Sequence, residues 1–332
     1  SRRRHTRSGP QSRGLGDVYK RQEKKGRADL FTDPLTVAAA ATVMSTPRKP
    51  KGRPPSPHQI LESIGRPMER HADRARELIE SISGTVREYA ENPYGARMLV
   101  YFLLLDHETE IRQKQLALIE EMAEPEVVET LKQAVASEIT IAPELRLPII
   151  DLAVPALRFL SEKQYQGFKN TITALVNADG KVDVFEYALQ KVLTCRLDPV
   201  FAGKVFRPSA NYYSIRGLVD EMSVLLSVLS RKGHGYGVDA ASAFSTAVDI
   251  INEPNVTFEM LEPDRCTWDQ LDVALQKLNE ASAQLKKLVL SAMLTCMMHD
   301  REITVEETEL FRAIATTLDC PVPPWVAPVE LD

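Results

Sequence analysis

Residues 177–189 read NADGKVDVFEYAL, and this stretch determines the fold class that the sequence predicts. Gly180 can adopt the left-handed conformation that commonly follows the end of a helix. Asp183 is suited to cap a second helix, and Glu186 follows it at the three-residue spacing of a capping box. The stretch therefore predicts two helices joined by a tight turn, which is a helical hairpin.

A second stretch, MHDREITVEETEL at residues 298–310, repeats this pattern 121 residues further along the chain. The matched pairs are Asp179 with Asp300, Val182 with Ile303, Val184 with Val305, Glu186 with Glu307 and Leu189 with Leu310. In each copy an apolar residue can close the turn, and an Asp or a Thr can cap the helix that follows. We therefore expect two helix-turn-helix units of the same design.

Beyond these two stretches, apolar residues recur at the spacing of helices. Leu78, Ile82 and Val86 follow one another at intervals of four residues, which indicates an amphipathic helix. Residues 98–105, MLVYFLLL, are apolar throughout and predict a buried core helix. Asp106 is predicted to cap the helix after it. Because strand signals are nearly absent, we predict an all-α fold of stacked helical hairpins.

Charge is distributed unevenly along the chain. Residues 1–57 hold 14 of the 41 Lys and Arg and 4 of the 46 Asp and Glu, which leaves 27 basic and 42 acidic residues for the rest. Within residues 45–57, STPRKPKGRPPSP, the KGRP sequence approaches the Arg-Gly-Arg-Pro core of an AT-hook in a single copy. We favour a Pro-rich basic linker over DNA contact. The acidic remainder predicts no nucleic-acid binding by the folded part.

The amino-terminal end lacks the composition of a folded domain. Residues 1–22 resemble a translated sequencing adapter, so we expect them to be foreign to a protein whose true beginning lies further upstream. We expect residues 1–57 as a whole to be disordered, because they contain few core-forming side chains. The folded part is predicted to contain a helical hairpin module at 58–140, a first helix-turn-helix unit at 141–205, and a helical region at 206–325 that ends in the second unit.

The sequence contains no complete catalytic motif. The HExxH motif of zinc peptidases, the phosphate-binding GxxxxGK[ST] motif and the GxSxG nucleophile elbow are all absent from it. Its four cysteines form no CxxC pair, which favours a reduced compartment. No run approaches the roughly 18 apolar residues that a membrane span needs. We therefore predict no catalytic residues in this chain, and no direct membrane insertion.

The first acidic turn admits two interpretations. Asp179, Asp183 and Glu186 bring carboxylate oxygens into one turn, as hard divalent cations require. The same Asp183 and Glu186 are fully explained as a capping box that builds the hairpin, and this is the interpretation we favour. In the second turn Arg301 and Thr304 take the places of Gly180 and Asp183, which argues against a cation there. Metal binding at the first turn therefore stays open beside helix capping.

Four segments resemble, in order, the carboxy-terminal region of bacterial membrane-embedded zinc metallopeptidases of the HtpX/CAAX-protease type. They are ENPYGARMLVYFLLLD at 91–106, LRLPIIDLAVPALRFLSEKQYQGF at 145–168, LVNADGKVDVFEYALQKVL at 175–193 and QLKKLVLSAMLTCMMHDREITVEETELFRAIATTLDCPVPP at 284–324. The second acidic repeat also resembles TerB-type helical modules. The two helix-turn-helix units are on this basis expected to be TerB-like.

The resemblance implies a non-catalytic regulatory or protein-interaction region of a membrane-bound zinc metallopeptidase. Zinc would belong to a catalytic domain absent from this chain, and the present region, soluble as a fragment, would lie at the cytoplasmic face of the bacterial inner membrane. Its partners would be that peptidase domain and substrate proteins. The alternative is a free-standing TerB-like stress-response module that binds a divalent cation through Asp179, Asp183 and Glu186. The DNA upstream of this reading frame would distinguish the two.

Overall fold

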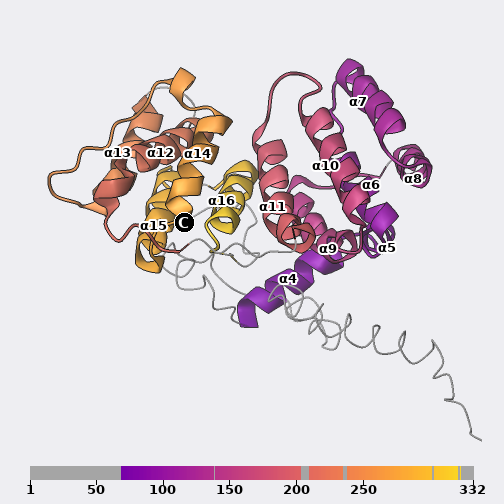
Figure 1. The fold of residues 1–332 in the computed structure, drawn as a ribbon, viewed down its shortest axis with the longest axis horizontal. Helices are drawn as coiled ribbons and strands as arrows, with labels where there is room; N and C mark the ends of the chain where they lie inside the picture. The colour runs from indigo at the N-terminus through magenta and orange to yellow at the C-terminus, as the bar shows by residue number, and fades with distance from the viewer. Residues whose placement is uncertain are drawn as a thin grey trace, which may run out of the picture. The chain divides into compact units, whose positions relative to one another are not determined.

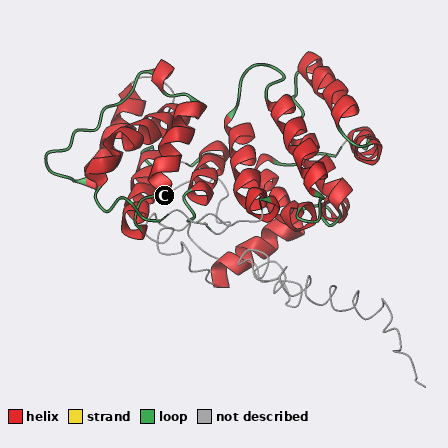
Figure 2. Ribbon diagram, in the orientation of Figure 1, coloured by secondary structure: helices red, strands yellow, loops and turns green. Residues whose placement is uncertain are grey.

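The computed structural model describes residues 69–137, 139–202, 209–234, 238–300, 303–320 and 322. These residues belong to the larger of two units into which the chain divides, Pro47–Asp332. The predictions for residues 1–57 and for Arg301 concern residues outside these described ranges. Within the described residues the all-α prediction is confirmed, since helices are joined by loops and no strand forms (Figure 2). An isolated bridge pairs Tyr212 with Ala281.

Helices follow one another along the described chain (Figure 1). The first set is α4 (Glu69–Ser81), α5 (Gly84–Ala90), α6 (Pro93–Leu103), α7 (Thr109–Met122), α8 (Pro125–Ala136), α9 (Arg146–Leu157), α10 (Glu162–Val176) and α11 (Val184–Phe201). The second set is α12 (Val219–His234), α13 (Val238–Ile251), α14 (Trp268–Asn279), α15 (Ala283–Met297) and α16 (Val305–Thr317). Short 3-10 turns are η2 (Pro143–Leu145), η3 (Ile215–Leu218) and η4 (Pro263–Arg265).

Two hydrophobic cores organise these helices. One is formed by α5 to α11 and contains Tyr101 and Phe168, whose ring centroids lie 5.7 Å apart. It therefore draws on both residues 58–140 and residues 141–205, which the sequence analysis placed in separate modules. The other core is formed by α12 to α16, with η3 and the segments between them. The domain limits drawn from the sequence stay predictions.

Helices α11 and α16 lie side by side and connect the two cores (Figure 1). Phe311 of α16 belongs to the second core, whereas Ala313 of the same helix belongs to the first. Tyr187 of α11 in turn packs into the second core. Residues 307–315 of α16 are buried without interruption, so this stretch of the helix is covered on every side.

A charge cluster accompanies the packing of α16 against α9 and α11. Arg146 binds Glu309 through two hydrogen bonds of 3.1 and 2.9 Å. Asp151 binds Arg312 at 2.6 Å and lies 3.4 Å from Arg196. Burial raises the pKa of Glu309 to about 7, although the Arg146 guanidinium acts in the opposite direction. We call these five residues the α9–α16 charge cluster.

The connection between α6 and α7 differs from the prediction. Helix α7 begins after Glu108, whose side chain makes no capping hydrogen bond. The Asp106 Oδ1 atom instead accepts the backbone N–H of Glu108 at 2.7 Å. The prediction that Asp106 caps α7 was therefore wrong by two residues, because this side chain stabilises the turn before the helix.

No helix in the described part of the chain is both long enough and apolar enough to cross a lipid bilayer.

Candidate functional site

The first acidic turn is built as a hairpin connection. Gly180 has a φ of +76°, the left-handed conformation that was predicted for it. The Asp183 Oδ1 atom accepts the backbone N–H of Glu186 at 2.7 Å, and Glu186 Oε2 accepts the backbone N–H of Asp183 at 2.9 Å. The predicted capping box is therefore confirmed at the start of α11.

The carboxylates proposed as cation ligands bind the backbone of their own turn. Asp179 Oδ1 accepts the N–H of Lys181 at 2.9 Å, while Asp183 and Glu186 serve the capping box. Across the residues that the structure describes, no three Asp, Glu, His or Cys side chains are grouped so that they could hold a metal ion. Metal binding by Asp179, Asp183 and Glu186 stays a prediction.

Glu186 has the most perturbed carboxyl group of this turn. Burial raises its pKa to about 7. The backbone N–H of Asp183 acts in the opposite direction, whereas the negative charges of Asp183, Asp179 and Asp106 raise the pKa further. Three neighbouring carboxylates thus act on the carboxyl group of Glu186 at the start of α11.

The second acidic turn repeats the capping box in a more buried setting. Glu307 Oε2 accepts the backbone N–H of Thr304 at 2.9 Å and its hydroxyl at 3.0 Å. Thr304 Oγ1 in turn accepts the N–H of Glu307. The predicted capping box is therefore confirmed at the start of α16 as well.

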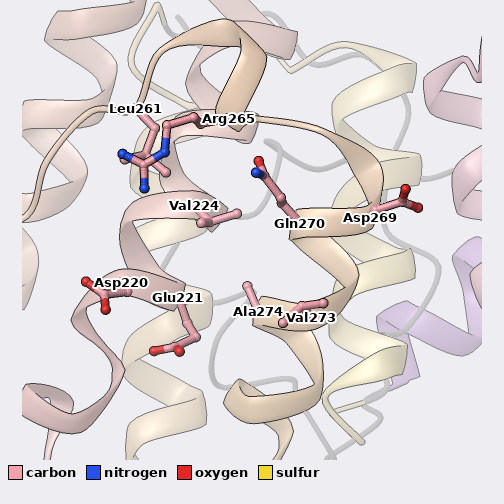
Figure 3. Close-up of a pocket in the computed structure, with 9 residues that line it drawn as sticks. All are labelled: Asp220, Glu221, Val224, Leu261, Arg265, Asp269, Gln270, Val273 and Ala274. Carbon is pink, nitrogen blue, oxygen red and sulfur yellow. The ribbon is translucent and has the colours of Figure 1, made fainter.

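A groove of about 310 Å³ lies between α12 and α14 (Figure 3). Val224 of α12 and Val273 and Ala274 of α14 line the middle of this groove. Val273 is 68% exposed, which is high for an aliphatic residue of a packed helix. We call this feature the α12–α14 groove, and its apolar floor consists of these three residues.

The two ends of the α12–α14 groove carry different charges. Figure 3 shows Asp220 and Glu221 at one end and Arg265, beside Leu261, at the other. Asp269 at the start of α14 points away from α12 in the same view. The groove is therefore acidic at one end, apolar in the middle and basic at the other end.

Side chains on one face of α12 hold the segment that forms the Leu261 end. Ser223 Oγ accepts the N–H of Glu259 at 3.2 Å, and Ser227 Oγ accepts the N–H of Leu261 at 2.9 Å. Arg231 Nε donates to the Leu261 carbonyl at 3.1 Å. Because these three side chains satisfy the backbone of an irregular segment, they fix that end of the groove in place.

Helix α14 is held from its other side by α11 and the first acidic turn. The Trp268 indole N–H donates to the Val182 carbonyl at 2.8 Å, and its ring stacks on Tyr187 at 4.3 Å. Asp272 accepts hydrogen bonds from the Tyr187 hydroxyl, at 2.6 Å, and from Lys191. The α14 wall of the groove is therefore anchored to α11 and to the first acidic turn.

The carboxylate of Glu221, at the acidic end, has a hydrogen-bond partner among the described residues on only one of its two oxygens. Its Oε1 atom accepts a hydrogen bond of 2.6 Å from Lys277, and this bond raises the pKa of Lys277. Its Oε2 atom is buried and accepts no hydrogen bond from any described residue. A buried carboxylate oxygen without a donor is unfavourable.

None of the residues that line the α12–α14 groove was predicted as part of a site. Ser223, Ser227 and Arg231 could have given a signal, because they recur every four residues on one face of an apolar helix. That spacing indicates a polar contact along the helix. It does not reveal that α14 would lie beside α12, so the groove itself could not have been predicted.

Comparisons with known proteins give no match. No protein-family model matches the sequence, and searches of curated proteins and of solved structures also find nothing similar.

Proposed function

We propose that this chain is a non-catalytic protein-interaction module whose α12–α14 groove binds a basic segment of a partner protein. The observation that carries the proposal is the 68% exposed Val273 on the floor of a 310 Å³ groove with anchored walls. Ligand sites are typically concave, largely apolar and preformed, with volumes from about 300 Å³. Asp220 and Glu221 are acidic and Arg265 is basic at the two ends of the groove, which favours a basic partner segment.

The chemistry of the lining also favours binding. Its nine residues include no Ser, Thr, Cys or His, so the lining offers no hydroxyl, thiol or imidazole nucleophile. The wider setting that we propose comes from the resemblance described above. In that setting the region belongs to a membrane zinc metallopeptidase, and its partners are the peptidase domain or the substrate proteins.

Substituting asparagine for Val273 tests the proposed function. Peptides would be selected from a random 12-residue display library on the full chain, and their affinities measured by fluorescence anisotropy. We expect Val273→Asn to weaken the selected peptides about tenfold, because the apolar contact of one aliphatic side chain contributes about 1.4 kcal/mol or more. Val273 is exposed, so the fold should tolerate the change.

Ile250→Asn is the matched control, since Ile250 is another exposed aliphatic residue, on α13 and outside the groove lining. It should leave peptide affinity unchanged. Selected peptides that bind both variants as tightly as the unmodified chain would place the interaction elsewhere and refute the proposed role of the groove. A library that yields no binding peptide would also count against it.

A cation-binding module remains the second candidate, favoured by the crowding of Asp106, Asp179 and Asp183 around Glu186. Without a cation, the raised pKa of Glu186 means that the native state holds a proton that the unfolded state releases above pH 4.5. Its contribution to stability is therefore fully present below about pH 4.5 and is lost as the pH rises through about 7.

We expect Glu186→Gln to remove this part of the pH dependence, as measured by urea unfolding between pH 4.5 and 8. Glutamine should preserve the capping box, because Gln164 and Gln270 occupy the same position at α10 and α14.

Calorimetric titration with Ca²⁺ tests whether the first acidic turn binds a cation. Saturable binding that is lost in Asp179→Asn, which spares the capping box, would favour the cation site over capping alone.

A further inference from the structure

We propose, on the basis of the proposed function, that binding in the α12–α14 groove is coupled to the first acidic turn through Trp268. The coupling involves two states. In the seated state, which the structure shows, the Trp268 indole N–H donates to the Val182 carbonyl. In the open state this bond is broken and the start of α14 has left the turn. A partner segment that binds the seated groove therefore holds the turn closed.

One peptide group in the turn carries the connection, because it is held on both sides. Its carbonyl oxygen, on Val182, accepts the Trp268 indole N–H at 2.8 Å. Its N–H group, on Asp183, donates to Glu186 Oε2 at 2.9 Å. Hydrogen bonds that follow one another in this way polarise and strengthen each other. The capping box of α11 and the seated position of α14 therefore support each other.

A second connection joins α11 to the groove floor. Tyr187 follows Glu186 in the capping box, and its ring stacks on Trp268 with the centroids 4.3 Å apart. The Tyr187 hydroxyl donates to Asp272 at 2.6 Å. Asp272 directly precedes Val273, which lies on the groove floor. The start of α11 thus contacts α14 at its first residue and again beside the groove.

Trp268 also contacts the opposite wall of the groove. The Lys232 Nζ atom, on α12, lies 4.8 Å from the centroid of the Trp268 ring. The first residue of α14 therefore contacts α12, α11 and the first acidic turn. A segment that enters between α12 and α14 acts on both walls, and both walls meet at this side chain. Any change in their spacing reaches the turn through Trp268.

Hydrogen exchange at the start of α11 measures how often this region opens. The Tyr187 amide donates to the Asp183 carbonyl at 3.2 Å, and the Tyr165 amide donates to the Ser161 carbonyl at 2.9 Å in the matching capping box of α10. If opening requires release of α14, a bound segment slows exchange by the factor 1 + [L]/Kd. A peptide selected on the full chain, at about ten times its Kd, should slow the Tyr187 amide about tenfold, as measured by NMR. Exchange of the Tyr165 amide should stay unchanged.

Trp268→Phe keeps an aromatic ring on Tyr187 but removes the N–H donor. Without peptide, this variant should speed exchange of the Tyr187 amide about fivefold, the effect of losing one hydrogen bond of ordinary strength. With peptide at about ten times its Kd for the variant, the slowing should fall to about twofold or less. Because Trp268 is outside the groove lining, this change removes no lining side chain. Tyr187→Phe, which removes only the bond to Asp272, is a second variant and should change exchange in the same direction.

Equal slowing of the Tyr187 and Tyr165 amides by the peptide would indicate general stabilisation and overturn the coupling. So would unchanged exchange at Tyr187 with a peptide that Val273→Asn weakens, and that result would leave the proposed function standing. If Val273→Asn has no effect on the peptides, the proposed function fails, and the coupling to the groove fails with it. Exchange at Tyr187 that neither Trp268→Phe nor Tyr187→Phe changes would overturn the coupling whatever the groove binds.

Discussion

Replacing Asp151 with alanine is expected to lower the free energy of unfolding by about 3–5 kcal/mol, the usual effect of breaking a buried ion pair. Asp151 binds Arg312 at 2.6 Å and lies 3.4 Å from Arg196. The side chains of the two arginines are only 8% and 12% exposed. The variant would leave both guanidinium groups poorly solvated and without this carboxylate, at the contact of α9 with α11 and α16.

The measurement is urea unfolding of the full chain, with the slope of the transition compared between variants. Glu120→Ala is the control, because Glu120 forms an ion pair of 2.8 Å with Lys132 in which both side chains are more than half exposed. We expect that variant to lose no more than about 1 kcal/mol. An effect of Asp151→Ala no larger than this would show that the α9–α16 charge cluster contributes little to stability.

Substituting alanine for Gly95 is expected to destabilise the chain by about 3 kcal/mol, near the upper end of the usual range for overpacking. A Cβ atom at position 95 would lie 2.4 Å from the carbonyl oxygen of Tyr89 and 2.7 Å from its Cα atom. Both are backbone atoms of α5, so the clash can be relieved only by moving α5 away from α6.

Gly167→Ala is the matched control for this effect. Gly167 lies inside α10, and a Cβ atom there would meet nothing within 4 Å. Alanine should stabilise this helix by about 0.5–1 kcal/mol, because glycine loses more conformational freedom on folding. The same chemical change should thus have opposite signs at the two positions, as measured by thermal and urea unfolding. Stabilisation by Gly95→Ala would contradict the close approach of α5 and α6.

Local features of the fold were predictable from the sequence. The capping boxes at Asp183 and Thr304, and the left-handed Gly180, depend on residues only a few positions apart. Similar boxes at Ser161 and Thr267 begin α10 and α14, outside the acidic repeat. Capping is therefore a general device of this chain, and the acidic repeat alone does not indicate a metal site.

Long-range features were not predictable. Asp151 and Arg312 are 161 residues apart in the sequence, and their contact depends on the packing of α16 against α9. Glu221 and Val273 meet at one groove only because α14 packs against α12 and is anchored on α11. The prediction that Asp106 caps α7 failed for a local reason. A short polar side chain near the start of a helix can accept a hydrogen bond within the preceding turn instead.

The central position of α16 has a consequence for synthesis on the ribosome. Helix α11 is complete at Phe201, but the helix that covers it ends at Thr317. Translation of the intervening 116 residues takes roughly 6–23 s at 5–20 residues per second. Throughout that interval the nascent chain exposes the apolar surface of α11, and Arg146 and Asp151 lack their partners Glu309 and Arg312 on α16. Chaperones that act on nascent chains would therefore meet this protein before α16 emerges.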